Sequence, residues 1–346
     1  MRAGVANYSG KGGIFKSSVN RQASLITFTD PVRAAQVLKR GGVVAFPTET
    51  VYGLGADAAN EDAVREVFRL KGRPADHPVI VHLPSAEQLE RWAKNVPDAA
   101  WRLAEAFWPG PLTLILERQP WVGSALTGGQ ETVGVRVPAH PLAQALLRRF
   151  GGGVAAPSAN RFGHISPTTA EHVRAEFGAA VQILDGGSAQ IGLESTILDL
   201  SSEVPRILRP GAVSAAMLAA VLQRPVLGAV GTSPRVSGSL KSHYAPQTPA
   251  LLVEDASAYS RKEDAVLSRK VQERAKIWRT LPDDPEGYAR ALYAALRTLD
   301  ASGSARILIE AVPDTPAWAA VRDRLVRATA SAEFAEKTKI VEETRG

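Results

Sequence analysis

The stretch LITFTDPVRAAQVLKRGGVVAFPTETVYGLG, residues 25–55, decides the fold. It opens with a β-rich run over residues 25–28, passes through a helical pattern over 31–40, and returns to a β-rich run over 43–46. Short runs of β-forming residues predict strands, and apolar residues at helical spacing predict a helix that covers them. Strands that alternate with helices in this way are typical of an α/β sheet domain.

The alternation of strands and helices continues beyond this stretch. Helical spacing predicts a helix over residues 61–70, and further β-rich runs predict strands at 79–82, 112–116, 133–137, 154–156, 181–184, 195–200 and 206–208. Some neighbouring strands are joined by connections too short for a crossover helix. The predicted fold class is therefore α/β, with a twisted mixed sheet covered by helices.

The chain is long enough for about two domains. The sheet domain is predicted to span residues 25–230, after an N-terminal extension over 1–24. Residues 231–249 are rich in Gly, Ser and Pro without a hydrophobic period, which predicts a linker. A smaller α/β domain over 250–334, followed by a polar tail over 335–346, is predicted from strands at 250–253 and 306–310 and helices at 263–278, 288–299 and 318–330.

The composition of the chain narrows its chemistry. The 346 residues include no cysteine, which excludes disulfides, thiolate metal sites and cysteine nucleophiles. No apolar run approaches the roughly 18 residues of a membrane span, and the start lacks the order of a secretory signal, so a cytoplasmic protein is expected. The net charge of +6 favours anionic partners such as nucleotides or RNA, although such charge is often spread over solvated surfaces.

One segment near the start superficially resembles a phosphate-binding loop. Residues 10–17, GKGGIFKS, contain glycines and a lysine. Phe15 replaces the glycine that must precede the lysine, and no strand leads into the segment. We interpret it as part of a flexible N-terminal extension.

Polar side chains follow the second predicted strand and the next helix. FPTETVYGLG, residues 46–55, brings threonines, a glutamate and a tyrosine to a strand end, where they can face a pocket; a plain glycine turn is the alternative. In KGRP, residues 71–74, two cations flank a glycine and suit a triphosphate, whereas a solvated helix end is the alternative. His82 ends the strand in HPVIVH, where a lone histidine is more often structural than catalytic.

Two later strands also carry polar groups toward one end. In TVGVRVP, residues 132–138, alternation places Thr132, Gly134 and Arg136 on one face of the strand. An arginine buried there requires an anion or a carboxylate, and a structural salt bridge would satisfy it equally well. In APSAN, small residues leave room for Ser158 and Asn160 to hydrogen-bond a ligand, and a simple turn is the alternative.

Taken in order, these segments resemble the Sua5/YrdC family in its two-domain Sua5 form. The series is FPTETVYGLG, KGRP, VIVH, TVGVRVP, APSAN, LESTILDL and RPG, followed by SHYAP. Each segment alone is weak evidence for the resemblance, whereas the whole series in this order is specific for the family. Residues 25–230 resemble the catalytic domain and residues 250–331 the Sua5-specific domain. The resemblance implies a YrdC-like catalytic domain joined to a smaller Rossmann-like α/β domain.

The resemblance also implies two sets of site residues. The residues around L-threonine are implied to be Thr50, His82, Arg136, Ala156 and Ser195, with Arg136 suited to the carboxylate. The residues that contact ATP or its adenylate are implied to be Lys71, Arg73, His77, Thr132, Ser158, Asn160 and Arg209. His77 stands where the family often has a smaller polar residue. Tyr244, in SHYAP, is implied to fold over the nucleotide, so that the linker would act as a lid.

The activity that the resemblance implies is synthesis of threonylcarbamoyl-adenylate and pyrophosphate from L-threonine, ATP and bicarbonate. Mg²⁺ is expected to accompany ATP, with no ligands assigned to it. The product would pass to a threonylcarbamoyl transferase complex that forms N6-threonylcarbamoyladenosine in tRNA. A weak direct contact with tRNA is also expected, and no contact with a membrane.

Two other functions are weighed against this one. The basic charge favours an RNA-binding module, but aromatic residues make up only 6% of the chain, which leaves few stacking platforms for bases. The carbamoyl-transfer module of hydrogenase maturation proteins resembles the same catalytic domain. Those proteins carry cysteine zinc motifs, and this chain has no cysteine.

Overall fold

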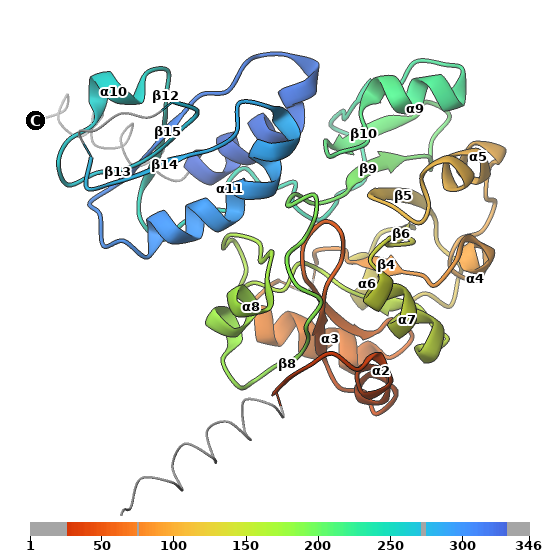
Figure 1. Ribbon diagram of the computed structural model, residues 1–346. Coiled ribbons are helices and arrows are strands. Elements are labelled where there is room, and N and C mark those ends of the chain that lie inside the picture. The colour runs from red at the N-terminus through yellow and green to blue at the C-terminus, as the bar shows by residue number, and fades with distance from the viewer. Residues whose placement is uncertain (1–25, 75, 271–274, 331–346) are drawn as a thin grey trace, which may run out of the picture.

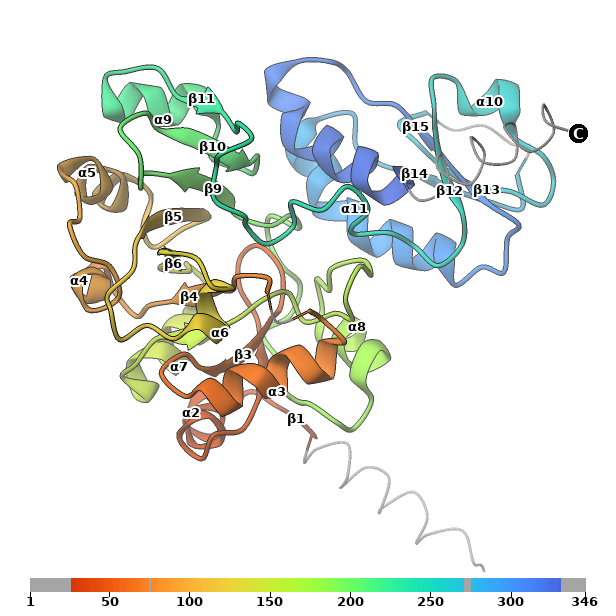
Figure 2. The same cartoon turned by 180° about the vertical axis from the view of Figure 1, so that it is seen from behind.

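The computed structural model describes residues 26–330, apart from residue 75 and residues 271–274. The predicted extension over residues 1–24 and the predicted tail over 335–346 lie outside the described residues. Figures 1 and 2 show two units: a larger one coloured red to green, and a smaller one coloured teal and blue. The segment over residues 231–249 runs between the two units (Figure 2).

An eleven-stranded mixed sheet forms the centre of the larger unit. From edge to edge its strands are β1 (Thr27–Phe28), β8 (Gln182–Leu184), β2 (Val44–Phe46), β3 (Gly53–Asp57), β7 (Val154–Ala155), β4 (Ile80–His82), β6 (Thr132–Arg136), β5 (Leu112–Glu117), β9 (Thr196–Asp199), β10 (Arg206–Arg209) and β11 (Leu227–Gly228). β4 runs antiparallel to β7 and parallel to β6. The predicted mixed α/β fold is confirmed, and every strand predicted in this unit is present.

Strand β3 was not predicted, because its glycines were interpreted as a turn at the end of β2. It pairs antiparallel with β2, with Gly53 opposite Phe46. A Cβ atom on Gly55 would lie 2.7 Å from the ring of Phe46 and 2.9 Å from Val154. Gly55 therefore leaves room for close packing inside the sheet, and only residues 47–52 form the connection between the two strands.

Helices cover the sheet, and their caps follow the sequence. They are α2 (Pro31–Lys39), α3 (Glu61–Lys71), α4 (Leu89–Trp92), α5 (Asp98–Phe107), α6 (Ser124–Thr127), α7 (Pro141–Phe150), α8 (Ala170–Phe177) and α9 (Ala215–Leu222), with a short 3-10 helix, η1 (Ala86–Gln88). The side chains of Asp30 and Asn60 accept hydrogen bonds from N–H groups in the first turns of α2 and α3, which otherwise lack partners. Gly72 ends α3 with a φ of 63°, a conformation that glycine adopts readily, directly after Lys71.

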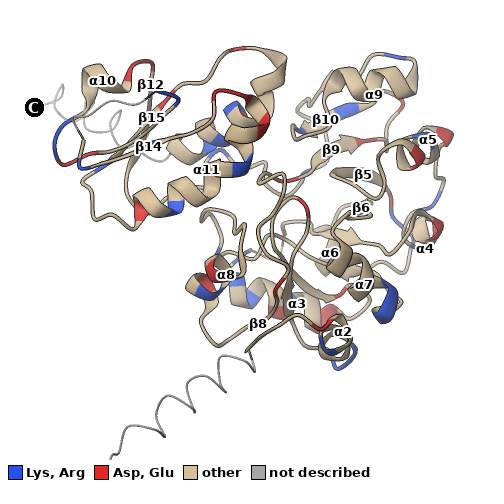
Figure 3. Ribbon diagram, viewed as in Figure 1, with Lys and Arg blue, Asp and Glu red and all other residues tan. Residues whose placement is uncertain are grey.

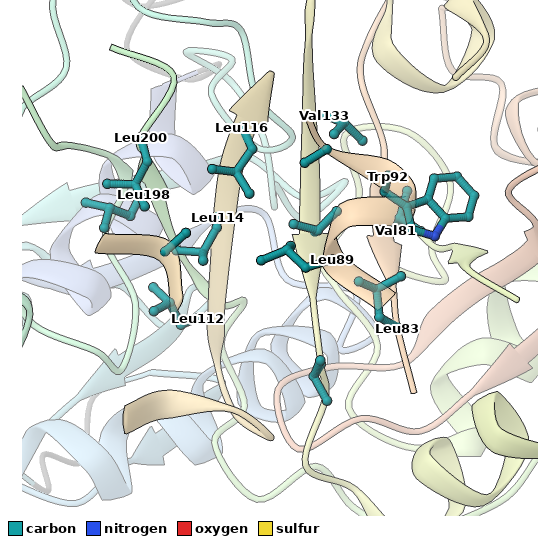
Figure 4. Close-up of a cluster of buried hydrophobic side chains, with 14 of the residues drawn as sticks. Val81, Leu83, Leu89, Trp92, Leu112, Leu114, Leu116, Val133, Leu198 and Leu200 are labelled. Atoms are coloured by element: carbon teal, nitrogen blue, oxygen red, sulfur yellow. The ribbon is translucent and has the colours of Figure 1, made fainter. Parts of the chain in front are cut away.

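The largest hydrophobic cluster lies between the sheet and helices α4 and α5. Leu112, Leu114 and Leu116 alternate along β5 and face the same side of the sheet, where they share one cluster with Val81 of β4 and with Leu89 and Trp92 of α4 (Figure 4). Both Leu112 and Leu114 have no exposed surface. Burying each such side chain contributes roughly 1.5–3 kcal/mol, so this cluster holds the central strands in place.

The smaller unit is a four-stranded parallel sheet in the order β12 (Ala250–Val253), β15 (Ile307–Glu310), β13 (Ala265–Ser268) and β14 (Ile277–Thr280). Its helices are α10 (Ala256–Tyr259), α11 (Pro285–Asp300) and η2 (Pro316–Trp318), and residues 319–330 are helical. Parallel strands joined by helices match the predicted smaller α/β domain.

One predicted element of this unit is wrong. Residues 263–278 were predicted to be a helix, and the structure instead places β13 and the start of β14 there. All four residues of β13 are buried, because the strand lies between β15 and β14 and is covered on both faces. A short, fully buried strand has no polar face, so its apolar residues cannot be distinguished from a helix by spacing alone.

The two units share a hydrophobic cluster. Val51, Ile165 and Leu193 of the larger unit are buried in one cluster with Tyr288 and Tyr293 of α11. The segment over residues 231–249 contains no helix or strand. Within the described ranges, none of the helices is long and apolar enough to cross a membrane.

A glycine substitution tests the packing of the sheet against α4. A Cβ atom on Gly153 would lie 2.4 Å from the ring of Trp92 and 2.5 Å from Val81, so Gly153→Ala should lower the free energy of unfolding by about 1–3 kcal/mol. Gly228→Ala is the matched control, because a Cβ atom there meets nothing within 4 Å. Urea unfolding of both variants measures the difference, and equal stability of the two would contradict the packing described here.

Candidate active site

One pocket gathers polar side chains from the ends of several strands and from the segment over residues 231–249. Its wall includes Thr48 and Thr50 from the connection between β2 and β3, and His82 at the end of β4. Arg136 ends β6, and Glu194 precedes β9, in the same wall. Segments far apart in the sequence thus meet because their strands are neighbours in one sheet.

The structure brings together most of the sequence-predicted site residues. All the residues predicted around L-threonine line the pocket: Thr50, His82, Arg136, Ala156 and Ser195. Of those predicted to contact the nucleotide, Ser158, Arg209 and Tyr244 line it as well. Thr132 lines a smaller adjoining pocket that shares Ile80 and Ser237 with the first. Lys71, Arg73, His77 and Asn160 line neither pocket but lie beside them.

Arg136 is buried and already has a carboxylate partner. Its Nη2 donates to Glu49 Oε1, its Nη1 donates to Thr50 Oγ1 at 3.0 Å, and its Nε donates to Gly110 O at 3.0 Å. The salt bridge that the sequence left open is therefore present, although it does not use the whole guanidinium. Arginine has five N–H donors, and among the described residues no acceptor takes the other two.

Glu49 was not among the predicted site residues. Its Oε2 accepts a hydrogen bond from the N–H of Ala139 at 3.0 Å, while Oε1 accepts from Arg136. The sequence places Glu49 next to Thr50 in FPTET, but it gives no signal for which acid pairs with which base. That pairing depends on β2 and β6 being brought together by the sheet.

Arg209 joins three parts of the pocket. Its Nε and Nη2 donate to Ser195 O at 3.1 and 2.9 Å, and Nη2 also donates to Ser195 Oγ at 3.1 Å. Its Nη1 donates to Ser237 O at 2.9 Å. The hydroxyl of Ser195 is held from the other side by Thr113, at 2.8 Å between the two oxygens. Thr113 is fully buried and was not predicted.

Lys71 and Arg73 bond to residues that line the two pockets. Lys71 Nζ donates to Ser158 O and Asn160 O, both at 2.5 Å, and Arg73 Nη2 donates to Pro78 O at 2.9 Å. Burial, reinforced by the neighbouring Arg73, lowers the pKa of the Lys71 ammonium well below its usual range. Burial likewise lowers the pKa of Arg73 to about 10.

Three buried cations beside the pocket form no direct ion pair with a carboxylate among the described residues. Among the described residues, Lys71, Arg73 and Arg209 have no carboxylate within salt-bridge distance, and their hydrogen bonds go to uncharged oxygens. All three side chains are buried. Burying a charge without a counterion is unfavourable, so this group of cations suits a ligand that supplies negative charge.

Tyr244 lies over the pocket from the segment between the units. Its φ of 60° is in the left-handed region, which side chains other than glycine adopt rarely. Its hydroxyl is buried and has no hydrogen-bond partner among the described residues. Gly238, with a φ of 81°, passes so close that a Cβ atom there would lie 2.1 Å from this hydroxyl and 3.2 Å from Arg209. The predicted role of Tyr244 as a lid stays a prediction.

His77 and His243 flank Phe162 next to the pocket. The ring of Phe162 is 5.5 Å from that of His77 and 6.2 Å from that of His243. Burial lowers the pKa of His243 to about 3, and burial also lowers the pKa of His82, in the pocket wall, to about 3. His82 and His243 are therefore neutral at physiological pH.

Glu194 is a second carboxylate that the sequence did not identify. Burial raises its pKa, but Arg324 and Arg209 outweigh this effect and lower the pKa to about 2. Ser166 Oγ donates to Glu194 Oε1 at 2.5 Å, and Tyr293 of α11 donates to Oε2 at 2.9 Å. Glu194 lies in LESTILDL next to Ser195. Its partners Tyr293 and Arg324 belong to the smaller unit, and the sequence of this segment does not indicate them.

Comparison with known protein families matches most of the described chain. A Sua5/YciO/YrdC family model described as "Telomere recombination" matches residues 36–211. A second model, described as "Threonylcarbamoyl-AMP synthase, C-terminal domain", matches residues 213–330. The two matches meet within the larger unit, before α9, whereas the large sheet continues to β11.

Individual relatives match nearly the whole chain. A threonylcarbamoyl-AMP synthase from Pyrococcus abyssi is 41% identical, over 86% of this chain and 93% of its own. One from Bacillus subtilis is 39% identical, over 88% of this chain and 94% of its own. The crystal structure of P. abyssi Sua5 complexed with L-threonine matches with a TM-score of 0.81 and 38% identity, over 87% of this chain and 94% of that one. The chain therefore belongs to the Sua5/YrdC family, in its two-domain Sua5 form.

Proposed function

We infer that this protein is a threonylcarbamoyl-AMP synthase, a nucleotidyltransferase that makes threonylcarbamoyl-adenylate for N6-threonylcarbamoyladenosine in tRNA. The observation that carries this conclusion is the group of buried cations without carboxylate partners, Lys71, Arg73 and Arg209, beside a small pocket lined by hydroxyl groups. The cations suit the phosphates of ATP, and the pocket suits a small hydroxy amino acid.

The reaction that we propose has two bond-forming steps. The amine of L-threonine adds to carbon dioxide derived from bicarbonate and loses a proton, which gives a carbamate. A carbamate oxygen then attacks the α-phosphorus of ATP, the bond from this phosphorus to the bridging oxygen breaks, and pyrophosphate leaves. Negative charge spreads over the phosphate oxygens in the transition state, so fixed cations stabilise it and no protein nucleophile is required.

Residues are assigned to the two substrates as proposals. The two N–H groups of Arg136 that no described acceptor takes would hold the carboxylate of L-threonine, while Glu49 keeps the guanidinium oriented. Thr50, His82, Ala156 and Ser195 would surround the rest of the amino acid. The nucleotide would be held by Lys71, Arg73, His77, Thr132, Ser158, Asn160 and Arg209, with Tyr244 above it.

Mg²⁺ is proposed to enter with ATP rather than to be held by the protein. Glu194 in the pocket wall and Glu49 next to pocket residue Thr50 are each paired with an arginine. Over the part of the chain that the structure describes, no group of three or more His, Asp or Glu side chains is placed to hold a metal ion. Mg²⁺ is commonly bound through substrate phosphates and water, which agrees with this arrangement.

The surface charge gives little support to the alternative of an RNA-binding module. In the view of Figure 3, basic and acidic residues are interspersed on the outer helices α3, α4, α5 and α8. Binding along a nucleic-acid backbone is favoured by basic residues gathered on one face. A weak contact with tRNA, hand-over to a transferase complex, and a cytoplasmic location stay predictions.

Mass spectrometry of the reaction products tests the proposed function. Purified protein is incubated with ATP, L-threonine, bicarbonate and Mg²⁺, and each component is omitted in turn. We expect threonylcarbamoyl-adenylate and pyrophosphate only when all four are present. Salt-dependent binding of RNA without threonine-dependent release of pyrophosphate would favour the RNA-binding alternative.

Substitution of Arg136 tests the proposed threonine site. Arg136→Lys keeps a positive charge beside Glu49 but loses the two-point contact with a carboxylate. The KM for L-threonine should rise roughly 10- to 100-fold, with a much smaller change in the KM for ATP. Arg148→Lys, on the exposed face of α7, is the control. An equal rise in the KM for L-threonine and the KM for ATP would contradict the assignment of Arg136 to the carboxylate of L-threonine.

Burial of neutral histidines predicts how stability depends on pH. Because burial lowers the pKa of His82 to about 3, while an unfolded histidine titrates near 6.5, the unfolded state takes up a proton first as pH falls. The free energy of unfolding should therefore fall below about pH 6.5, and His82 alone should account for about 2 kcal/mol between pH 7.5 and 5.0. In urea unfolding, His82→Asn should show a shallower decline over this interval; an unchanged slope would argue against a buried, neutral His82.

A further inference from the structure

Arg324 connects the smaller unit to the pocket of the larger one. It belongs to the helix over residues 319–330, and its side chain is fully buried. Its Nε donates to Glu194 Oε2 at 2.8 Å, and its Nη1 donates to Asp323 Oδ2 at 2.6 Å. Glu194 lines the proposed active site, so a side chain of the smaller unit determines the position of a pocket carboxylate.

The same guanidinium also contacts Tyr244. The Arg324 Cζ atom lies 5.1 Å from the centre of the Tyr244 ring, within the range of a cation–π interaction. The ring of Tyr293 stacks on the ring of Tyr244, with the two centroids 5.8 Å apart. The hydroxyl of Tyr293 donates to the same Glu194 oxygen as Arg324. Arg324, Glu194, Tyr293 and Tyr244 thus form one buried group that spans both units.

The next turn of this helix holds the chain beside Tyr244. The carbonyl oxygen of Arg327 accepts a hydrogen bond from the N–H of His243 at 3.3 Å. The Nη1 of Arg327 donates to the carbonyl oxygen of Leu240. Residues three apart lie on the same face of a helix, so Arg324 and Arg327 act on adjacent parts of the segment.

Tyr244 requires such support for a physical reason. Its φ of 60° is unfavourable for a tyrosine, and a conformation of this kind persists only when surrounding contacts maintain it. Glu194 has a parallel requirement, because a buried carboxylate without its cation is strongly destabilising. Arg324 meets both requirements with one side chain.

We propose that Arg324 is a positioning residue for the synthase reaction, by which the smaller unit holds Glu194 and the Tyr244 ring in place over the nucleotide pocket. The proposal rests on the proposed function. It assigns the helix over residues 319–330 a part in the active site, although none of its residues lines the pocket.

The experiment compares three variants of the full-length chain with the wild type. Arg324→Met removes the charge, and Arg324→Lys keeps a charge but not the planar group. Arg290→Met is the matched control, because Arg290 is exposed and also bonds across the units, to Gln190 O at 2.7 Å, without contact to Glu194 or Tyr244. Each variant is assayed for pyrophosphate release and for trypsin cleavage after Lys241, which is exposed in the segment next to Tyr244.

If Arg324 positions the pocket, Arg324→Met should lower kcat/KM for ATP by at least about tenfold and speed cleavage after Lys241, with a smaller change in the KM for L-threonine. Arg324→Lys should fall between Arg324→Met and the wild type, and Arg290→Met should match the wild type in both assays. Folded Arg324→Met with the kinetics and cleavage rate of the wild type would overturn the proposal. So would an equal loss in Arg290→Met.

A double variant covers the case in which Arg324→Met does not fold. Glu194→Gln with Arg324→Met removes both charges, so no unpaired carboxylate remains. We expect it to fold, to stay slow with ATP, and to be cleaved faster after Lys241; wild-type behaviour in both assays would overturn the proposal. If the wild type itself makes no product, the proposed function fails, and the cleavage assay alone then decides whether Arg324 holds the segment.

Discussion

Buried positive charge without a directly bonded carboxylate is the constraint on which this site depends. Lys71, Arg73 and Arg209 are desolvated, and the described groups around them are uncharged oxygens rather than carboxylates. Lys71 ends helix α3, Arg73 follows it, and Arg209 ends β10, and residues of α3 and of the central strands are packed in one large hydrophobic cluster. A ligand with phosphates relieves the imbalance, which couples affinity to fold stability.

The carboxylates near the pocket serve a different purpose from the cations. Glu49 and Glu194 are each bound to an arginine, Arg136 and Arg324, so they orient side chains instead of opposing the negative charge of a nucleotide. One of these pairs lies within the larger unit, and the other joins the two units. The pocket wall therefore combines residues positioned by the sheet with one carboxylate, Glu194, that is bonded by a side chain of the smaller unit.

Elements and site residues could be predicted from the sequence where they lie in a local pattern. Ion pairs between residues of distant segments could not be predicted. Most strands of the large sheet, though not β3 or β11, were predicted from β-rich runs, and the helix that ends at Lys71 was predicted from helical spacing. The ordered segments then implied the residues that line the pocket. Glu194 and Arg324 were missed because 130 positions separate them and neither stands in a pattern that names the other. The strand β13 was taken for a helix because burial on both faces removes its alternation.

Gly238 changes how the composition of the segment between the units should be interpreted. Glycine and serine in a connecting segment usually indicate freedom of movement. Here the absence of a side chain at position 238 creates the space that the Tyr244 hydroxyl occupies beside Arg209. The glycine at this position is therefore required for the packing of the Tyr244 side chain. Segments of similar composition without a glycine at this position would leave no space for the tyrosine hydroxyl.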